Sequence, residues 1–544
     1  MSKNSVKYSS ERRRRAPDII AAVLIALCIF LLGFFNLDNN CNWGDDFAAY
    51  MSDGIALAQG RYGEQIRINK ILRDSVATDS AGISVHVHAW GFPLLEAAVY
   101  KLAGFDTVNF DNLYLYKLPS LFFFSIMAGV CYLFFRRRMS VLPSLILVTV
   151  LCCSLEFMDA IRNLYNDVVF MALSLISFYC AECCLDCRKS RSKILLSVLL
   201  GILLWFSYSV RLNGITIILT VLLQHIIALV REKRRPEPSD FVPYGVFLLL
   251  VIIFNVIVFP QPTSTSSLID DFSLSHLVTG TAYYWDQLAN WVHGTFFNIF
   301  AVPVYTVFNF LLPGLNVSPA VEPLTDILCW LFLIFAVIGF INDGLKRDTH
   351  LALYILLSFI GTAALNLGQD LRYLYVLLPH ILAFAAGGIR WTVSAGGSFC
   401  RKKHEAPVRR KKYLMPAAAV LTAVVCLFAA LPLLRADIEN RRNFNREPLT
   451  AYSEEAVETY GYIRRELGRD KTIAFFKPRA LYLNTGNVSM LPGRNDFKIS
   501  SADYYLYYKP DPDFLLTEDI EDCFCLEFEN GEFALYRNLK CNDC

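Results

Sequence analysis

Long apolar runs separated by short polar segments make up most of the chain. Eleven such runs lie near residues 19–36, 113–135, 140–155, 167–186, 194–208, 213–230, 242–260, 325–343, 351–367, 372–389 and 414–434. A helix of about 20 apolar residues crosses about 30 Å of hydrocarbon. It also satisfies its own backbone hydrogen bonds there. The pattern therefore predicts a mainly α-helical, polytopic membrane bundle of about 11 spans.

Basic residues cluster in every second connection between these runs. The clusters are Arg12–Arg15, Arg136–Arg138, Arg188–Lys193, Arg231–Arg235, Lys346–Arg347 and Arg401–Lys412. Lys and Arg accumulate in cytoplasmic loops, so these connections are expected inside the cell. An odd number of spans puts the two ends of the chain on opposite sides. We expect a multi-pass protein of the cell (plasma) membrane, with its N-terminus in the cytoplasm and its C-terminal region outside.

The first run follows a basic segment, residues 1–18, and raises the alternative of a cleaved signal peptide. The apolar run Ile19–Phe35 is longer than the apolar region of a signal peptide, and no clear small-residue cleavage motif follows it. We interpret it as a retained first span. The membrane domain is then expected to cover residues 19–434.

Three larger segments are expected on the outer side. Two are loops of the membrane domain, at about 37–112 and about 261–324, and the second holds the aromatic stretch Tyr283–Phe310, which suits helices in the membrane interface. The third, 435–544, is expected to be a soluble α/β domain. Its Ser453 suits a helix N-cap before Glu454. Strand-like runs follow at Thr472–Phe476, Ala480–Leu483, Tyr504–Tyr508 and Phe533–Tyr536.

Composition supports the membrane interpretation and names no nucleic-acid partner. Hydrophobic residues make up 55% of the chain and charged residues 18%, with a net charge of +2; soluble chains carry about 25% charged residues. Of the 16 Cys, many lie in apolar runs and are expected to act as small hydrophobic residues. In an oxidising outer compartment some of the tail cysteines can pair: Cys523, Cys525, Cys541 and Cys544.

The first outer loop collects acidic and histidine residues near the membrane edge. Asp45 and Asp46 follow the first span directly and precede an amphipathic segment that ends at Gly60. His86 and His88 alternate in a strand-like stretch and so share one face. A second amphipathic segment, Phe92–Gly104, closes the loop.

The order of these motifs resembles the GT-C glycosyltransferases, in particular the protein mannosyltransferases and the bacterial aminoarabinose transferases. The matching phrases are Asp45-Asp46, Ala58-Gln59-Gly60, Phe92-Pro93-Leu94-Leu95, Asn166-Asp167, Val210-Arg211-Leu212, Arg372-Tyr373 with Pro379, and Phe476-Lys477-Pro478. One departure is the phrase His88-Ala89-Trp90-Gly91-Phe92-Pro93, which stands where relatives have Lys-Pro-Pro or Tyr-Pro-Pro. An acidic metal ligand known nearby in some relatives is not evident here.

The resemblance implies a transferase that moves a sugar from a polyprenyl-phosphate donor to a cell-envelope acceptor, a lipid, glycan or protein, with inversion at the sugar carbon. A carboxylate is expected to take the acceptor's proton: Asp45 first, Asp46 second. Arg211 and Arg372 are expected to bind the donor phosphate, because arginine matches phosphate with two donors and stays charged. A divalent metal ion is a further expectation, held by Asp46, Asp167, His86 or His88.

Each residue also has a structural interpretation, and two other functions stay open. The other acids could be ordinary residues of a solvated loop, and Asp167 could be a helix N-cap. The two histidines could be a solvated pair, and the two arginines could be interface anchors. A transporter or flippase of lipid-linked saccharides would place ionisable residues near the bilayer midplane. A polymerase or ligase would place essential charges in loop 261–324, at Asp270, Asp271 and His276.

The charge pattern predicts the side on which the C-terminal region lies. Alkaline phosphatase fused after Cys544 should be active, since it folds only outside the cytoplasm, and green fluorescent protein fused there through the same secretion route should stay dark. The same reporters fused after Arg138 should give the reverse result. Fluorescence from the C-terminal fusion would contradict the orientation.

Overall fold

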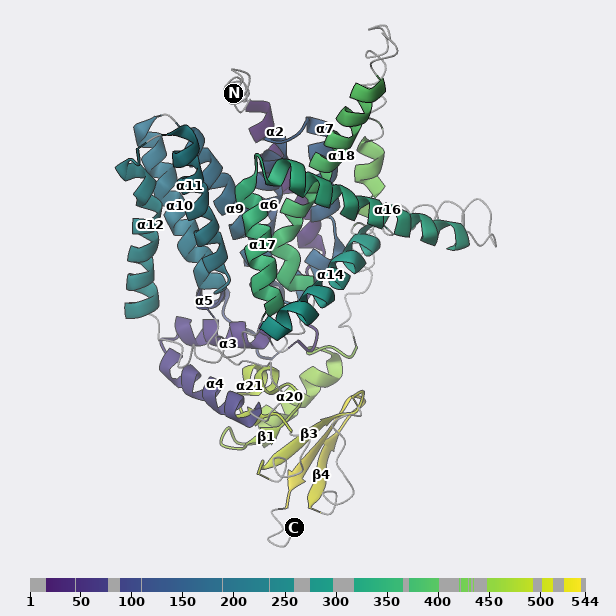
Figure 1. Cartoon of the computed structure of the whole chain (residues 1–544). Coiled ribbons are helices and arrows are strands. Elements are labelled where there is room, and N and C mark those ends of the chain that lie inside the picture. Colours follow the sequence, from purple (N-terminus) through teal and green to yellow (C-terminus); the bar gives the residue numbers. More distant parts are fainter. Residues whose placement is uncertain are drawn as a thin grey trace.

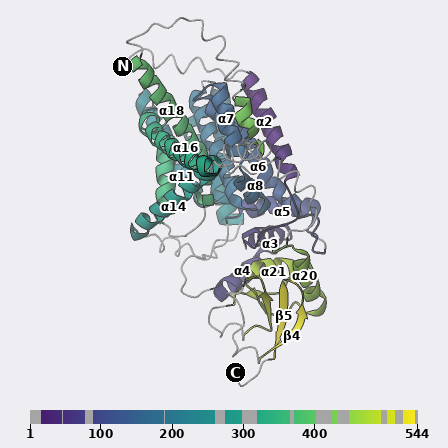
Figure 2. The same ribbon diagram turned by 90° about the vertical axis from the view of Figure 1, so that its right-hand side faces the viewer.

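A computed structural model describes residues 16–44, 46–76, 89–108, 110–187, 189–233, 235–258, 274–296, 318–364, 371–400, 448–492, 501–511 and 523–539, with short stretches between 420 and 434. A helical bundle makes up most of it, and a small sheet lies beyond one end of the bundle (Figure 1). We call this the sheet-side end. Helices α3 (Asp46–Ala58) and α4 (Tyr62–Val76) lie between bundle and sheet (Figure 2).

The predicted fold class is confirmed by the bundle. Eight helices of the described residues are long and apolar enough to cross a membrane, or nine if the bent pair α7 (Val141–Cys152) and α8 (Leu155–Arg162) forms one span. The predicted run near 351–367 is the shorter helix α17 (Thr349–Ala364). The predicted run near 414–434 lies largely outside the described residues. The remaining bundle elements are α2 (Ala16–Phe35), α6 (Leu113–Arg136), α9 (Asn166–Asp186), α10 (Ser190–Val210), α11 (Gly214–Glu232), α12 (Pro238–Leu250) with η1 (Val251–Val258), α14 (Leu274–Phe296), α16 (Ser318–Gly339) with η3 (Phe340–Gly344), and η4 (Leu371–Leu377) with α18 (Leu378–Cys400).

Helix α9 is the centre of the bundle. Its apolar window is 89% buried, whereas the windows of α2 and of α12 with η1 are 17% and 6% buried. It packs on α6, α10, α11 and η4. The peripheral helices expose their Leu and Ile side chains, as lipid-facing helices do. The residues at the two ends of α9 are therefore held rigidly by their neighbours.

The first loop folds into three short helices against the sheet-side end. The predicted amphipathic segments are confirmed as α3 and α5 (Gly91–Ala103), which pack on each other. The pairing is close because Gly54 faces α5: a Cβ there would lie 2.6 Å from the Glu96 Cβ. Helix α4 was not predicted, since its sequence is polar overall and its apolar positions are few.

A buried charge network anchors the start of this loop to the bundle. The Lys117 ammonium on α6 is completely buried and donates to the Asp38 carboxylate at 2.6 Å, and Arg162 Nε donates to the same carboxylate at 2.7 Å. Burial alone would raise the pKa of Asp38, but Lys117 and Arg162 hold it below its ordinary value. The carboxylate therefore joins α6 and α8 to the segment that leads into α3.

The C-terminal region forms one mixed sheet with two helices. The strands are β1 (Ile473–Ala474), β2 (Ser489–Met490), β3 (Tyr504–Tyr508), β4 (Phe524–Glu529) and β5 (Phe533–Asn538), in the order β2-β1-β3-β5-β4. β1 runs parallel to β2 and β3, while β5 runs antiparallel to β3 and β4. Cys523 is disulfide-bonded, and Cys525 is a free, exposed thiol.

Two predictions for this region had different outcomes. The helix after Ser453 is confirmed as α20 (Glu454–Glu466), with Ser453 Oγ accepting from the Ala456 N–H at 3.1 Å. The predicted strand Ala480–Leu483 is wrong, because these residues lie in the helix α21 (Pro478–Thr485). Pro478 occupies the first turn, where a helix needs no N–H, and Gly486 ends it in the left-handed conformation.

Trp43 connects the first loop to the C-terminal region. Its ring packs against Phe475, Phe476, Tyr508 and Phe533, with ring centroids 5.1 to 6.0 Å apart. The backbone is tied there as well, since the Ala451 N–H donates to the Cys41 carbonyl at 3.0 Å. The C-terminal region thereby fixes the residues just before α3.

The Asp38 network should be essential for stability. Asp38→Asn leaves Lys117 buried without its counter-charge and should lower the free energy of unfolding by about 3 kcal/mol. Asp186→Asn is the control, because Asp186 is exposed and pairs with Arg137 at the surface. Thermal unfolding in detergent measures both.

The pH dependence has a defined sign. The pKa of Asp38 is lowered in the fold, so its contribution is present above the ordinary value of 3.8 and is lost as pH falls below it. The gap between wild type and Asp38→Asn should therefore shrink below about pH 4. Equal stability of the two proteins at pH 7 would contradict this role.

Candidate active site

Two charge pairs meet at the sheet-side end of the bundle. In the first, Arg372 Nη1 on η4 lies 3.2 Å from Asp46 Oδ2 on the first residue of α3. The Asp46 side chain is 34% exposed and that of Arg372 is 17% exposed. The carboxylate is therefore reachable from solvent, while the guanidinium is held on the protein side. The Arg372 guanidinium also lies over the Tyr165 ring, 4.6 Å from its centroid.

The second pair joins the end of α10 to the start of α9. The Arg211 guanidinium contacts the Asp167 carboxylate, whose side chain is 5% exposed, and Nη1 also donates to Asn166 Oδ1 at 3.1 Å. The Tyr373 ring lies 4.5 Å from the guanidinium. Burial by itself would lower the pKa of Arg211, but Asp167 raises it above its ordinary value, so the guanidinium stays charged.

Local backbone features hold Arg211 in this position. Helix α10 ends at Val210, whose carbonyl accepts from Asn166 Nδ2 at 3.2 Å. Gly91 opens α5 directly against this turn: a Cβ there would lie 2.6 Å from the Ser209 carbonyl carbon. The absence of a side chain at Gly91 lets α5 touch the backbone that presents Arg211.

A cavity of about 210 Å³ lies beside the two pairs. Its charged wall consists of Asp167, Arg211 and Arg372, and its other walls come from the spans α9, α11, α17 and η4. Phe170, Ile215, Tyr373 and Val376 give these walls apolar surface, and Asn213, Thr216, Ser358 and Thr362 add uncharged polar side chains. One chamber thus combines two guanidinium groups with a surface suited to hydrocarbon.

The structure brings four of the seven predicted site residues together. Asp46, Asp167, Arg211 and Arg372 form the two pairs, and the interaction between Arg372 and Asp167 is also favourable. The predicted N-cap role of Asp167 is wrong, because Tyr165 occupies that position of α9. Asp45, His86 and His88 lie outside the described residues.

Sequence reasoning missed the residues that support these charges. Tyr165 and Tyr373 each face one guanidinium, and Asn166 holds Arg211. Two exposed acids on α8, Glu156 and Asp159, lie nearby and add negative charge around Tyr375. Their positions in the sequence were the available signal, because Tyr165, Asn166 and Tyr373 lie within two residues of Asp167 or Arg372.

Among the described residues, one group could hold a metal ion, and it lies elsewhere. Glu182, Asp348 and His350 place their ligand atoms within 4.8 Å of one another. Glu182 is 15 residues along α9 from Asp167, about 22 Å away at the usual helical rise. Arg138 Nη2 already donates to Asp348 at 2.9 Å and also contacts Glu182. An ion there cannot reach the two charge pairs.

Comparison with solved structures identifies the fold. ArnT from Cupriavidus metallidurans in its apo state aligns with a TM-score of 0.51 at 10% identity, over 96% of this chain and 98% of that chain. ArnT bound to undecaprenyl phosphate gives 0.47 at 10% identity, with the same coverage. An oligosaccharyltransferase from Archaeoglobus fulgidus gives 0.47 at 11% identity, over 92% of this chain and 70% of that one. No protein family and no curated protein matches the sequence. The chain has the GT-C fold, which confirms the expected resemblance at the level of fold.

The Asp167–Arg211 pair should show strong coupling. Arg211→Gln leaves a buried carboxylate without its partner and should cost about 3 kcal/mol of stability. Asp167→Asn with Arg211→Gln removes both charges and should recover most of that loss, as a double-mutant cycle on thermal unfolding in detergent would measure. Additive losses would show that the two side chains do not depend on each other.

Proposed function

We propose that this chain, with its GT-C fold, is a membrane glycosyltransferase that moves a sugar from a polyprenyl-phosphate donor to a cell-envelope acceptor. The observation that carries the proposal is the chamber in which Arg211 and Arg372 face apolar walls beside a solvent-accessible carboxylate, Asp46. These are the groups needed to bind a lipid phosphate and to accept a proton.

A lipid-linked donor fits the position of the site. Nucleotide sugars are cytoplasmic, so a transferase of the outer face needs a donor that reaches the membrane edge. A polyprenyl chain dissolves in hydrocarbon while its phosphate stays at the interface. Arg211 and Arg372 would hold that phosphate through charge-assisted hydrogen bonds. ArnT, with the same fold, has been solved with undecaprenyl phosphate, and we propose a ligand of that class here.

The reaction we propose is a single displacement. The acceptor oxygen attacks the anomeric carbon as the bond from that carbon to the phosphate oxygen breaks. The phosphate leaves with the electron pair, and the arginines stabilise its charge. Asp46 takes the acceptor's proton. Asp45, the neighbouring residue, is the other candidate base. Attack from the face opposite the leaving group inverts the sugar carbon.

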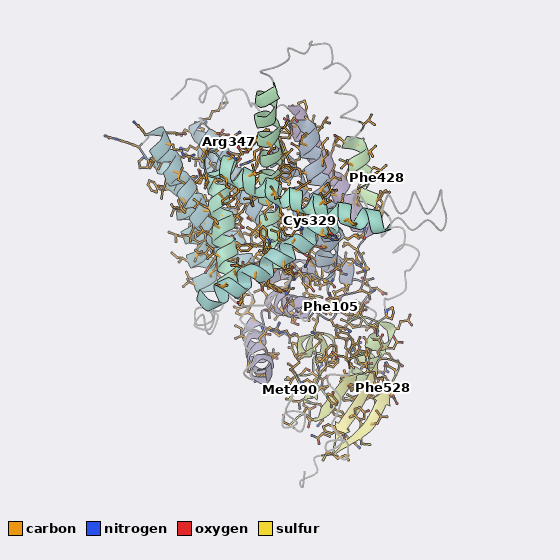
Figure 3. The ribbon with its side chains drawn as sticks, turned by 45° about the vertical axis from the view of Figure 1, so that its right-hand side comes forward. Phe105, Cys329, Arg347, Phe428, Met490 and Phe528 are labelled. Carbon is orange, nitrogen blue, oxygen red and sulfur yellow. The ribbon has the colours of Figure 1, made fainter. Side chains whose placement is uncertain are left out.

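Charge placement supports work at the outer face. The basic residues Arg136, Arg137, Arg138 and Arg347 lie at the end of the bundle opposite the candidate site, as cytoplasmic residues do; Arg347 is labelled in Figure 3. The disulfide at Cys523 fits an oxidising compartment for the sheet. We therefore propose a cytoplasmic N-terminus and an outer C-terminal region.

The described residues do not form a metal site beside the cavity lined by Asp167, Arg211 and Arg372, which we call the donor chamber. Asp46 and Asp167 each already contact a guanidinium, which would repel a divalent cation placed on the same oxygens. The cationic role toward the phosphate is filled by Arg211 and Arg372. In the proposed reaction the arginines alone therefore stabilise the phosphate charge, and the predicted involvement of His86 and His88 stays a prediction.

A transporter is less well supported than an enzyme. The central helix α9 carries no Asp, Glu, Lys, Arg or His between Asp167 and Glu182. A transporter of charged saccharides is expected to place ionisable residues near the midplane. Charges instead gather at the two ends of α9, which suits chemistry at one surface. The segment on which a polymerase or ligase would depend, with Asp270, Asp271 and His276, lies outside the described residues.

Replacing the base should remove transfer and leave donor binding. Asp46→Asn should lower the transfer rate by about 10²- to 10⁴-fold, measured as radiolabel moved from a polyprenyl-phosphate sugar into envelope material. Asp45→Asn is assayed beside it, because either neighbour is a candidate base. Asp111→Asn is the control, an exposed acid on the same side of the bundle.

Binding of the lipid phosphate separates a chemical role from misfolding. Both Asn variants should insert into the membrane and bind undecaprenyl phosphate within about threefold of wild type, since they keep Arg211 and Arg372. Unchanged transfer by Asp45→Asn and by Asp46→Asn would overturn the catalytic assignment.

A further inference from the structure

A second, larger cavity lies between the first loop and the C-terminal region. Its volume is about 510 Å³, more than twice that of the donor chamber. Its walls come from α3, α4 and α5 on one side and from α20, α21 and the segment before β2 on the other. Phe105, one of the lining residues, marks this junction in Figure 3. We call it the arginine cavity.

Four arginines line this cavity against a single acid. They are Arg61, Arg67, Arg464 and Arg469, and the acid is Glu64. Glu64 pairs with Arg61 at 3.8 Å. Within the described part of the chain, no carboxylate lies within ion-pair distance of the other three. Burial and the neighbouring Arg465 lower the pKa of Arg464, and the carboxylate of Asp106 opposes this shift in part.

A buried hydroxyl adds a second reason to expect a ligand. Ser52 on α3 is 7% exposed, and its Oγ has no hydrogen-bond partner although it belongs to a lining residue. Buried polar groups of native proteins are nearly always hydrogen-bonded. By contrast, the neighbouring Gln59 Nε2 donates to the Tyr100 hydroxyl at 2.6 Å. The Ser52 hydroxyl is thus a buried, unpartnered donor in the wall of the arginine cavity.

Helix α3 links the arginine cavity to the candidate base. Asp46 is its first residue, and Ser52, Ile55 and Ala56 line the arginine cavity. From Asp46 to Ala56 the helix rises about 15 Å. The arginine cavity and Asp46 therefore lie about 15 Å apart along α3, and the intervening helix residues, Phe47–Gly54, are buried.

We propose that the arginine cavity binds the acceptor through an anionic part that carries two or more phosphate or carboxylate groups. This inference rests on the proposed function, because it assigns the acceptor's class. Several guanidinium groups around one cavity match several anionic oxygens. The distance along α3 further requires an elongated acceptor, whose reacting hydroxyl lies about 15 Å from its anionic groups. A phosphorylated or acidic envelope glycan has this form, and a lone monosaccharide does not.

The test uses the full chain in detergent and two simple anions. Isothermal titration with pyrophosphate, and separately with citrate, should show saturable binding to the wild type at low salt. Arg67→Gln with Arg469→Gln should weaken the tighter of the two by about tenfold or more, because two charge-assisted contacts are lost. Arg465→Gln with Lys471→Gln changes the net charge equally outside the cavity lining and should alter binding by less than about twofold.

Tighter binding of pyrophosphate would identify phosphate as the acceptor's anionic group, and tighter binding of citrate would identify carboxylate. Absence of saturable binding by the wild type would overturn the inference. Equal weakening by the two double variants would overturn it too, since it would show a general charge effect. A third variant, Arg372→Gln, should keep pyrophosphate or citrate binding and lose undecaprenyl phosphate binding.

These two readouts separate failure of the inference from failure of the proposed function. In one outcome, Arg372→Gln loses undecaprenyl phosphate binding but anion binding does not depend on the cavity arginines. That outcome would support the donor site and contradict the acceptor proposal. Cavity-dependent anion binding with unchanged lipid binding in Arg372→Gln would keep the anion site and remove the proposed donor site.

Discussion

Two guanidinium groups and two carboxylates meet at the sheet-side end of the helical bundle, and the elements around them hold them there. Asp167 and Arg211 are nearly buried, so each needs the other to offset the cost of leaving water. Arg372 and Asp46 are more open, and the Asp46 side chain is 34% exposed. Four separate elements, α3, α9, α10 and η4, each deliver one of these charges.

Packed elements support the four charges from the protein side. The buried helix α9 fixes Asp167 from within the bundle, and Gly91 lets α5 press on the turn that carries Arg211. The Asp38 network and Trp43 hold the segment before Asp46 to the bundle and to the C-terminal aromatic core. The C-terminal region therefore has two roles. It braces α3, and it completes the arginine cavity along the same helix.

Much of this arrangement could be predicted from the sequence where the signal was local. The length of the apolar runs predicted the spans, and the amphipathic segments of the first loop predicted α3 and α5. The family-like phrases pointed to Arg211 and Arg372. The ion pair between Arg372 and Asp46 could not be predicted, because the two residues are 326 positions apart and nothing in the sequence around either one indicates its partner. The error at Ala480–Leu483 has a local cause. The residues of this run favour a strand, but Pro478 and Gly486 at its two ends favour a helix. The arginine cavity joins residues from 52 to 488, so periodicity alone gave no sign of it.

The most direct test of the account is a cryo-electron microscopy structure of the full chain with undecaprenyl phosphate. We expect the lipid phosphate within hydrogen-bond distance of both Arg211 and Arg372, with the polyprenyl chain along the apolar wall that includes Phe170 and Val376. A phosphate bound away from both arginines, with the Asp46–Arg372 and Asp167–Arg211 pairs undisturbed, would contradict the account.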